Sequence, residues 1–122
     1  MKLIFKWNGQ CRYNVASRSN VFVDSYVSVT TNNEISLQTA LATKGPVSVA
    51  LYVTNNFKSY ASGVFIDNTC PYGNINHAVT LVGYDKDASG NEYYILRNQW
   101  GTSWGKYMNF IYTHGTKEIL IV

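Results

Sequence analysis

Long apolar runs are absent from this sequence. The chain has 122 residues, and none of its apolar stretches approaches the about 20 residues that a membrane-spanning helix needs. Near the start, Lys6 interrupts the apolar residues that follow Lys2. The remaining run is shorter than the about 7–15 residues of a signal peptide core. We therefore expect no contact with a membrane and no targeting segment within these residues.

Clusters of basic residues are absent as well. Ten Lys and Arg residues against seven Asp and Glu residues give a formal net charge of +3. The basic residues are scattered from Lys2 to Lys117 without forming a run. Because nucleic-acid binding needs a concentrated basic patch, we expect no nucleic-acid partner.

Cysteine is scarce, since the chain contains only Cys11 and Cys70. Two cysteines are too few to define a disulfide framework. Together with His77 and His114 they could offer four zinc ligands, but their spacing forms no compact ligand pair. A reactive thiol needs a helix N-terminus or a fixed cation beside it, and neither neighbourhood indicates one. The sequence therefore predicts no metal, no cofactor and no nucleophilic cysteine.

What the chain does contain is enough apolar material for one core. Hydrophobic residues make up 46% of the sequence, and ten of its residues are tyrosines, which suit β-strands. No linker, repeat or low-complexity run divides the chain. Its length is typical of one domain, so we predict a single domain over residues 1–122, with residues 1–18 irregular.

The hydrophobic periodicity predicts many strands and one substantial helix. Thr31 and Glu34 match a capping box at the start of the helix, and Gly45-Pro46 ends it. One helical turn is expected at residues 57–61. Strands are expected within residues 19–29 and at residues 47–52, 64–66, 77–85, 92–98, 107–113 and 119–122. The predicted fold class is α+β: a mainly antiparallel, partly open β-barrel-like half-domain with one or two short helices.

Two of these strands carry the residues that point to chemistry. His77 opens the strand at residues 77–85, and Asn98, followed by Trp100, closes the strand at residues 92–98. The polar loop at residues 86–91 predicts a hairpin between them, which brings His77 and Asn98 side by side. Such a pair can hold an imidazole in one tautomer for nucleophilic catalysis. A histidine at a strand end can equally well bond only to a backbone carbonyl, and the Asn98-Gln99-Trp100-Gly101 partner favours the catalytic interpretation.

Four segments in order resemble the papain-like (cathepsin L-like) cysteine proteases. They are Gly45-Pro46-Val47-Ser48-Val49-Ala50-Leu51, Gly63-Val64-Phe65, the stretch beginning Asn76-His77-Ala78, and Asn98-Gln99-Trp100-Gly101-Thr102-Ser103-Trp104-Gly105. Gln99 stands where the family usually has serine. The resemblance runs from about Cys11 to Gly105 and covers the C-terminal, β-rich half of such a protease.

This resemblance implies a set of site residues. His77 and Asn98 match the catalytic histidine and its orienting asparagine. Trp100 matches a tryptophan that covers their hydrogen bond from water and contacts the substrate as the floor of the leaving-group side. Ala50, Ile75 and Ala78 match positions lining the pocket for the substrate side chain two residues before the cut. Their apolar character favours Leu, Val or Phe there, although Ile75 can equally be a packing residue of the barrel.

The resemblance also implies what lies outside the chain. The family's nucleophile sits in a Cys-Gly-Ser-Cys-Trp type segment about 130–150 residues before the histidine and asparagine, whereas His77 has only 76 residues before it. The partners of the cysteines matching Cys11 and Cys70 are also absent, so we expect the two to remain unbonded to each other. Members of the family are secreted or lysosomal, and this location is the one implied here.

The sequence thus predicts the C-terminal portion of a papain-like cysteine endopeptidase, inactive alone. Its expected partners are a peptide or protein substrate, a complementary N-terminal Cys-bearing half, and a propeptide or cystatin-like inhibitor. The alternative is a non-catalytic pseudoprotease or a peptide- or inhibitor-binding module.

Overall fold

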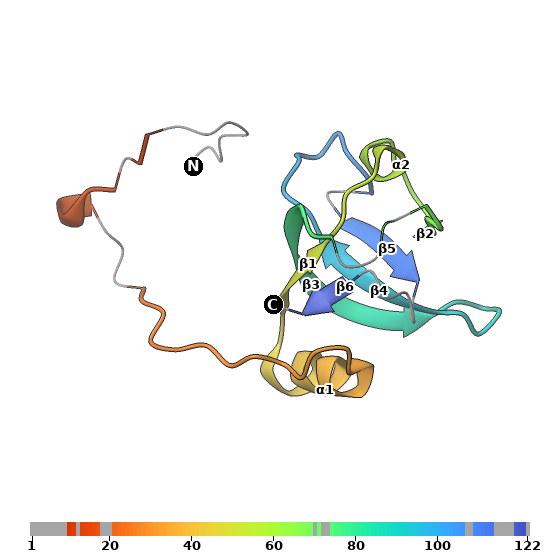
Figure 1. Ribbon diagram of the computed structural model, residues 1–122, viewed down its shortest axis with the longest axis horizontal. Coiled ribbons are helices and arrows are strands. Elements are labelled where there is room, and N and C mark those ends of the chain that lie inside the picture. Colours follow the sequence, from red (N-terminus) through yellow and green to blue (C-terminus); the bar gives the residue numbers. More distant parts are fainter. Residues whose placement is uncertain are drawn as a thin grey trace.

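The structure of the chain is a computed structural model (Figure 1). It describes residues 10–11, 13–17, 21–69, 71, 74–106, 109–113 and 119–121. The helical elements are η1 (Val15–Ser17), α1 (Glu34–Lys44) and α2 (Asn55–Lys58). The strands are β1 (Val47–Leu51), β2 (Val64–Phe65), β3 (His77–Lys86), β4 (Glu92–Arg97), β5 (Asn109–Thr113) and β6 (Ile119–Ile121).

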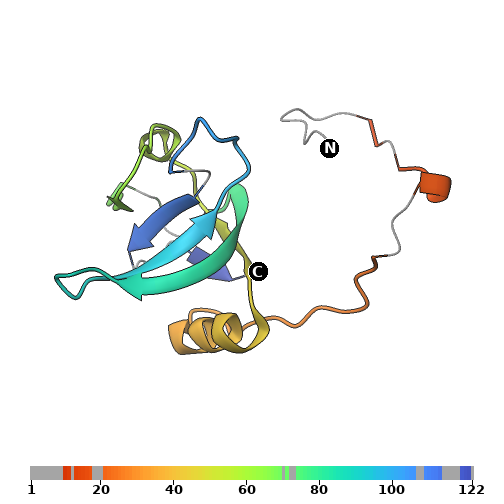
Figure 2. The same ribbon diagram turned by 180° about the vertical axis from the view of Figure 1, so that it is seen from behind.

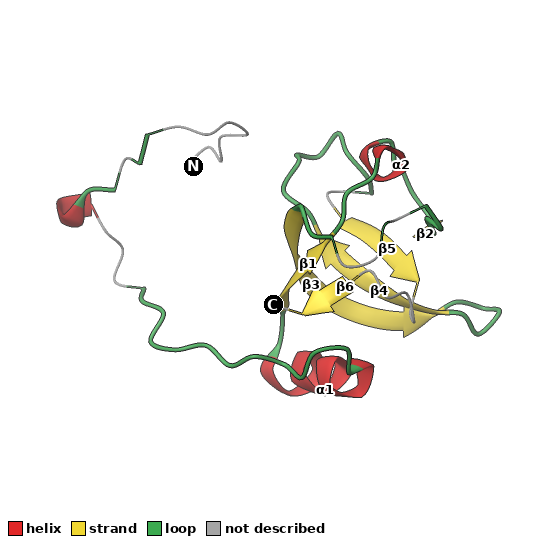
Figure 3. Ribbon diagram, viewed as in Figure 1, coloured by secondary structure: helices red, strands yellow, loops and turns green. Residues whose placement is uncertain are grey.

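The strands form one sheet in the order β2-β5-β4-β3-β1-β6. The long strands β3, β4 and β5 are the yellow arrows easiest to follow in Figure 3. Every neighbouring pair is antiparallel except β2 with β5, which is parallel. The predicted class of a mainly antiparallel α+β half-domain with short helices is confirmed. The parallel pair was not predicted, because periodicity within a strand carries no information about the direction of its neighbour.

The core lies on the sheet face that α1 and α2 help to cover. Side chains alternate along a strand, so Val49 and Leu51 of β1 share a face with Val79 and Leu81 of β3. All four are at most 5% exposed. Leu37 and Leu41 of α1, one turn apart, belong to the same cluster. The helical face that carries Leu37, Ala40 and Leu41 therefore turns inward, with Ala40 half-buried.

The start of α1 corrects one prediction. The N-cap is Asn33, whose side-chain oxygen accepts a hydrogen bond from the Ser36 backbone N–H at 2.9 Å, and not Thr31. Thr31 and Asn32 instead form a turn, in which Asn32 has a positive φ of 55°. Asparagine tolerates this left-handed conformation and is also a strong N-cap, so the chain starts the helix two residues later than a capping box at Thr31 requires.

The predicted strand within residues 19–29 is wrong. The described part of this stretch forms no strand, and Figures 1 and 2 show it running from α1 away from the sheet. Val23 and Val27 are 88% and 92% exposed. An alternating pattern forms a stable strand only where another strand supplies hydrogen bonds and a core covers one face, and the described residues supply neither here. Only Val29 packs against the core.

Other bounds differ slightly from prediction. The helical turn expected at residues 57–61 begins two residues earlier, at Asn55, because Thr54 caps α2 by accepting a hydrogen bond from the Phe57 backbone N–H. Most of residues 1–18, all of 107–108 and 114–118, and Cys70 lie outside the described residues. In the part of the chain that the structure describes, no helix is long and apolar enough to cross a membrane.

Candidate active site

His77 and Asn98 meet because of the register between β3 and β4. Thr80 lies opposite Arg97 in this antiparallel register, so Asn98, which follows Arg97, lies beside Val79, which precedes Thr80. His77 is two residues from Val79 and therefore lies on the same face. The distance between His77 Nε2 and Asn98 Oδ1 is 2.9 Å, as the strand–hairpin–strand interpretation predicted.

A second hydrogen bond defines the proton on this histidine. The Gln99 backbone N–H donates to Asn98 Oδ1 at 2.9 Å. A backbone N–H can only donate, so the Asn98 atom facing it is the carbonyl oxygen and not the amide nitrogen. The same oxygen faces His77 Nε2, which must therefore carry a proton. In the neutral ring this leaves Nδ1 as the basic nitrogen.

Aromatic rings cover this hydrogen bond on one side. The Trp100 ring centroid lies 5.0 Å from that of His77, with the planes inclined by 37°. The Trp100 ring centroid also lies 5.0 Å from that of Trp104 and 5.5 Å from that of Phe57. Trp104 is 9% exposed, and its indole N–H donates to the Lys58 carbonyl oxygen at 3.0 Å. Trp104 is therefore a core residue that supports Trp100.

The three residues predicted to line a substrate pocket lie near one another in the fold. Ala50 of β1 pairs directly with Ala78 of β3, and Asn76, next to Ile75, donates its backbone N–H to the Leu51 carbonyl oxygen. Ala50 is 4% exposed and Ile75 is 49% exposed, while Ala78 is also exposed. All three side chains are apolar, and Ile75 is the large one among them and is half-exposed.

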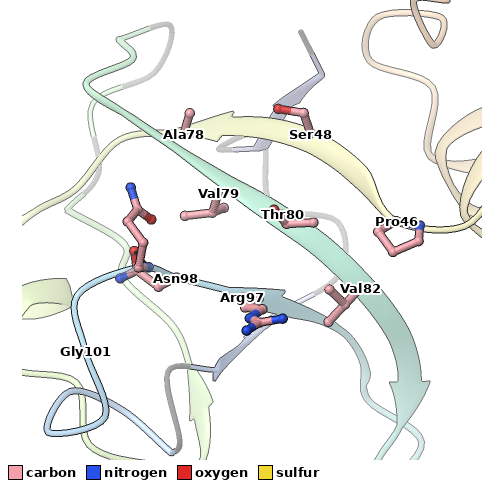
Figure 4. Close-up of a pocket in the computed structure, with 10 residues that line it drawn as sticks. Pro46, Ser48, Ala78, Val79, Thr80, Val82, Arg97, Asn98 and Gly101 are labelled. Atoms are coloured by element: carbon pink, nitrogen blue, oxygen red, sulfur yellow. Dashed lines mark hydrogen bonds between the residues drawn. The ribbon is translucent and has the colours of Figure 1, made fainter. Parts of the chain in front are cut away.

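Beside Ala78 lies an open hollow of about 670 Å³ that sequence reasoning missed. Its lining includes Ser48, Thr80 and Arg97, whose side chains Figure 4 shows on three adjacent strands. Ser48 pairs with Thr80, and Thr80 pairs with Arg97, so the three form one polar row across the sheet. Only the strand register, which the sequence does not state, brings them together.

Asn98 also borders this hollow, and half of its amide is unsatisfied. The side chain is 3% exposed, and its Nδ2 atom has no hydrogen-bond partner among the described residues. Leaving a buried donor unpaired costs about 1–3 kcal/mol. The oxygen of the same amide, by contrast, faces both the His77 ring and the Gln99 backbone N–H.

A buried carboxylate beside α2 was not singled out from the sequence. Asp67 is 6% exposed and accepts hydrogen bonds from the side chains of Thr54, Asn56 and Thr69. The bond from Thr54, followed by that from Thr69, holds the pKa of Asp67 below its usual value. A single aspartate in a loop belongs to no sequence motif from which such a hydrogen-bond network could be predicted.

The described residues contain no group of three or more His, Cys, Asp and Glu side chains arranged to hold a metal ion. Cys11 is an exposed free thiol, far along the chain from His77, while Cys70 lies outside the described residues.

Comparison with known proteins identifies the family to which the chain belongs. The family model described as papain family cysteine protease matches residues 4–120. The chain belongs to the papain family of cysteine proteases. A cathepsin L-like proteinase of Fasciola hepatica is 38% identical over 98 residues, which cover 80% of this chain and 29% of that protein. Ananain of Ananas comosus is 37% identical over 99 residues, covering 80% of this chain and 27% of that protein.

Solved structures agree with this family assignment. Digestive procathepsin L 3 of the Tenebrio molitor larval midgut superposes with a TM-score of 0.79 at 34% identity. The match covers 88% of this chain and 34% of that one. Bromelain of Ananas comosus, solved in complex with the E64 inhibitor, gives a TM-score of 0.67 at 37% identity, covering 75% and 41%. The papain-family chain described here thus spans about a third of the length of its relatives.

Proposed function

We propose that this chain supplies the histidine and asparagine of a papain-like cysteine endopeptidase. His77 is the acid–base and Asn98 its orienting partner. The observation that carries the proposal is the 2.9 Å hydrogen bond from His77 Nε2 to Asn98 Oδ1, which leaves Nδ1 free. The nucleophilic thiol belongs to a complementary Cys-bearing half, because the Cys-Gly-Ser-Cys-Trp type segment that carries it in the family does not occur in this sequence.

The proposed chemistry follows from which ring nitrogen is free. His77 Nδ1 takes the proton of the incoming thiol, and the resulting imidazolium keeps the thiolate ionised. The thiolate attacks the peptide carbonyl carbon, and Nδ1 returns the proton to the leaving amine as the C–N bond breaks. Water then hydrolyses the thioester with Nδ1 as the base, which regenerates the thiol. Asn98 takes no proton but holds the ring in this tautomer throughout.

The substrate is a peptide or protein with an apolar residue two before the cut. Ala50 and Ala78, opposite each other on β1 and β3, and the half-exposed Ile75 form a wall without charge. A small apolar wall accommodates Leu, Val or Phe and offers no partner to an Arg guanidinium.

The polar row of Ser48, Thr80 and Arg97 is the proposed contact for the complementary half. Arg97 is exposed and has no ion pair within the described part of the chain. A carboxylate presented by the partner would pair with Arg97, and a partner acceptor near Asn98 would satisfy the buried Nδ2 atom. A propeptide or a cystatin-like inhibitor would compete with the substrate for the surface around His77. The proposed secreted or lysosomal location rests on the family alone.

Reconstitution from two chains tests this proposal. A Cys-bearing half of a papain-family relative is mixed with this chain, and cleavage of a peptide with Leu or Phe two before the cut is followed. We expect no cleavage by this chain alone and measurable cleavage by the mixture. His77→Ala should abolish that rate, whereas Asn98→Ala should reduce it by about 10–100-fold, since orientation is lost while the base remains.

Controls separate this function from its rivals. Asn91→Ala, in the β3–β4 hairpin remote from the site, should leave the rate unchanged, and replacing the nucleophilic cysteine of the supplied half by serine should remove it. Binding of the half or of a peptide without any cleavage would favour the non-catalytic peptide- or inhibitor-binding module. Cleavage by this chain alone that resists a thiol alkylator would overturn the cysteine-protease proposal.

A further inference from the structure

The Asp67 carboxylate joins two segments that are otherwise separate in the chain. Its Oδ2 atom accepts from Thr54 Oγ1 at 2.6 Å and from Asn56 Nδ2 at 3.3 Å. Its Oδ1 atom accepts from the Thr69 backbone N–H at 2.9 Å and from Thr69 Oγ1 at 2.5 Å. Four donors thus converge on one side chain that is 6% exposed. The carboxylate ties the start of α2 to the loop after β2.

The tie at Thr54 also orders the cap of α2. Thr54 donates its hydroxyl proton to Asp67, and its oxygen accepts the Phe57 backbone N–H at 3.1 Å. Because α2 is a single turn of four residues, it has no stability of its own. Its position must come from the groups that hold it, and Asp67 holds it by both Thr54 and Asn56.

The same short helix α2 also contacts the two tryptophans of the candidate site. Phe57 is 1% exposed and packs against Trp100 and Trp104, with ring centroids 5.5 and 5.1 Å away. The Lys58 carbonyl oxygen accepts the Trp104 indole N–H at 3.0 Å. Trp100 in turn lies 5.0 Å from the His77 ring. A continuous series of contacts therefore runs from Asp67 through α2 and the indoles to the imidazole.

We propose that Asp67 is a positioning residue for His77: its carboxylate holds α2 against the tryptophan pair, and so keeps Trp100 packed over the His77–Asn98 hydrogen bond. The residue touches neither substrate nor reacting atoms. The relevance of this inference to catalysis rests on the proposed function, but the positioning itself does not, since it concerns the state of the His77 ring in this chain alone.

The His77 Nε2 proton provides a direct readout. This proton is held by Asn98 and shielded by Trp100, so its exchange with water, followed by ¹⁵N-resolved NMR of the full chain, reports on both. His77→Gln identifies the signal against that of His114. We expect Asp67→Ala to speed the exchange of this ring proton by about tenfold or more, through local opening around α2, while the backbone amides of Leu81 and Leu96 keep their protection.

A second carboxylate provides the matched control. Asp87 accepts hydrogen bonds from the Ser89 and Asn91 backbone N–H groups and from the Asn91 side chain, but it lies in the β3–β4 hairpin, away from α2 (Figure 3). Asp87→Ala should therefore leave the His77 ring proton within about twofold of its original exchange rate. A faster exchange in both variants would indicate general destabilisation and contradict the proposal.

Asp67→Asn keeps the test decisive if the alanine variant fails to fold. Asparagine has one acceptor oxygen where aspartate has two, so it can satisfy the Thr69 donors or those of α2, but not both. We expect an exchange rate between those of the original chain and the alanine variant. An unchanged His77 proton in this folded variant would overturn the proposal. The two proposals can fail separately. If Asp67→Ala speeds the exchange of the ring proton but the original chain shows no activity in a two-chain mixture, the catalytic role of His77 is contradicted and the positioning role of Asp67 stands.

Discussion

His77 and Asn98 are joined by a hydrogen bond that spans 21 positions of the sequence, at 2.9 Å between Nε2 and Oδ1. The bond lies under Trp100, and the same Asn98 oxygen accepts the Gln99 backbone N–H. The two donors converge on one oxygen from different directions, so rotation of the Asn98 amide would lose both bonds. The imidazole is therefore held in one tautomer before any partner arrives.

Asn98→Ala should release that tautomer. Without the oxygen, the neutral His77 ring has no group that selects Nε2–H over Nδ1–H, so both forms become populated. The ¹⁵N chemical shifts of the ring at neutral pH distinguish the two forms. Asn91→Ala, which removes an amide in the hairpin, serves as the control and should leave the ring shifts in place. Identical ring shifts in the original chain and in Asn98→Ala would contradict the orienting role.

Leu96→Ala should strongly destabilise the fold. Leu96 is fully buried in β4, opposite Leu81 of β3, and its truncation should cost about 2–5 kcal/mol in the free energy of unfolding. Urea denaturation followed by circular dichroism measures this loss. Ile35→Ala on α1 removes an apolar side chain that is 78% exposed, and should change the free energy by less than about 0.5 kcal/mol. Equal losses for both variants would mean that β4 is not part of the core.

Alkaline pH should destabilise the fold through Tyr94. Burial, followed by the negative charge of Glu34, raises the pKa of Tyr94 from 10.0 to about 12. The unfolded chain therefore releases this proton more readily than the folded one. The corresponding stability is complete below pH 10.0 and is lost as the pH rises towards about 12. Tyr94→Phe removes the ionisable group, so its free energy of unfolding should fall less steeply over that interval. A slope equal to that of the original chain would show that other groups dominate.

Thiol titration should find two free thiols per monomer. Cys11 is exposed and free, and the resemblance to papain-like proteases implies that the partner of Cys70 lies outside this chain. The denatured, unreduced protein treated with a thiol reagent gives the count, and Cys11→Ser should lower it by one. A count of zero in a monomer would mean that the two cysteines are bonded to each other.

Local sequence patterns determined most of the strands and the identity of the central pair. The alternation in β3 and β4 follows from a sheet with one covered face, and the polar loop between them predicts the hairpin. Together these predict that His77 lies near Asn98, whereas the register between β3 and β4, with its irregularity between Leu81 and Gly83, brings the two side chains into hydrogen-bond contact. The helix stop at Gly45 is equally local, because its positive φ of 93° suits glycine. Such features need only near neighbours in the chain.

Only the tertiary structure decided which predicted strands pair with a neighbouring strand. The alternating valines at positions 21–29 read as a strand, but no described strand lies beside them, and a strand is stable only as part of a sheet. Conversely, Ser48, Thr80 and Arg97 form a row only because of the register of three strands. Asp67 is held beside α2 by Thr54 and Thr69, which donate hydrogen bonds to its two different carboxylate oxygens. Pairing between strands and convergence on a buried charge depend on contacts distant in sequence, which no local period encodes.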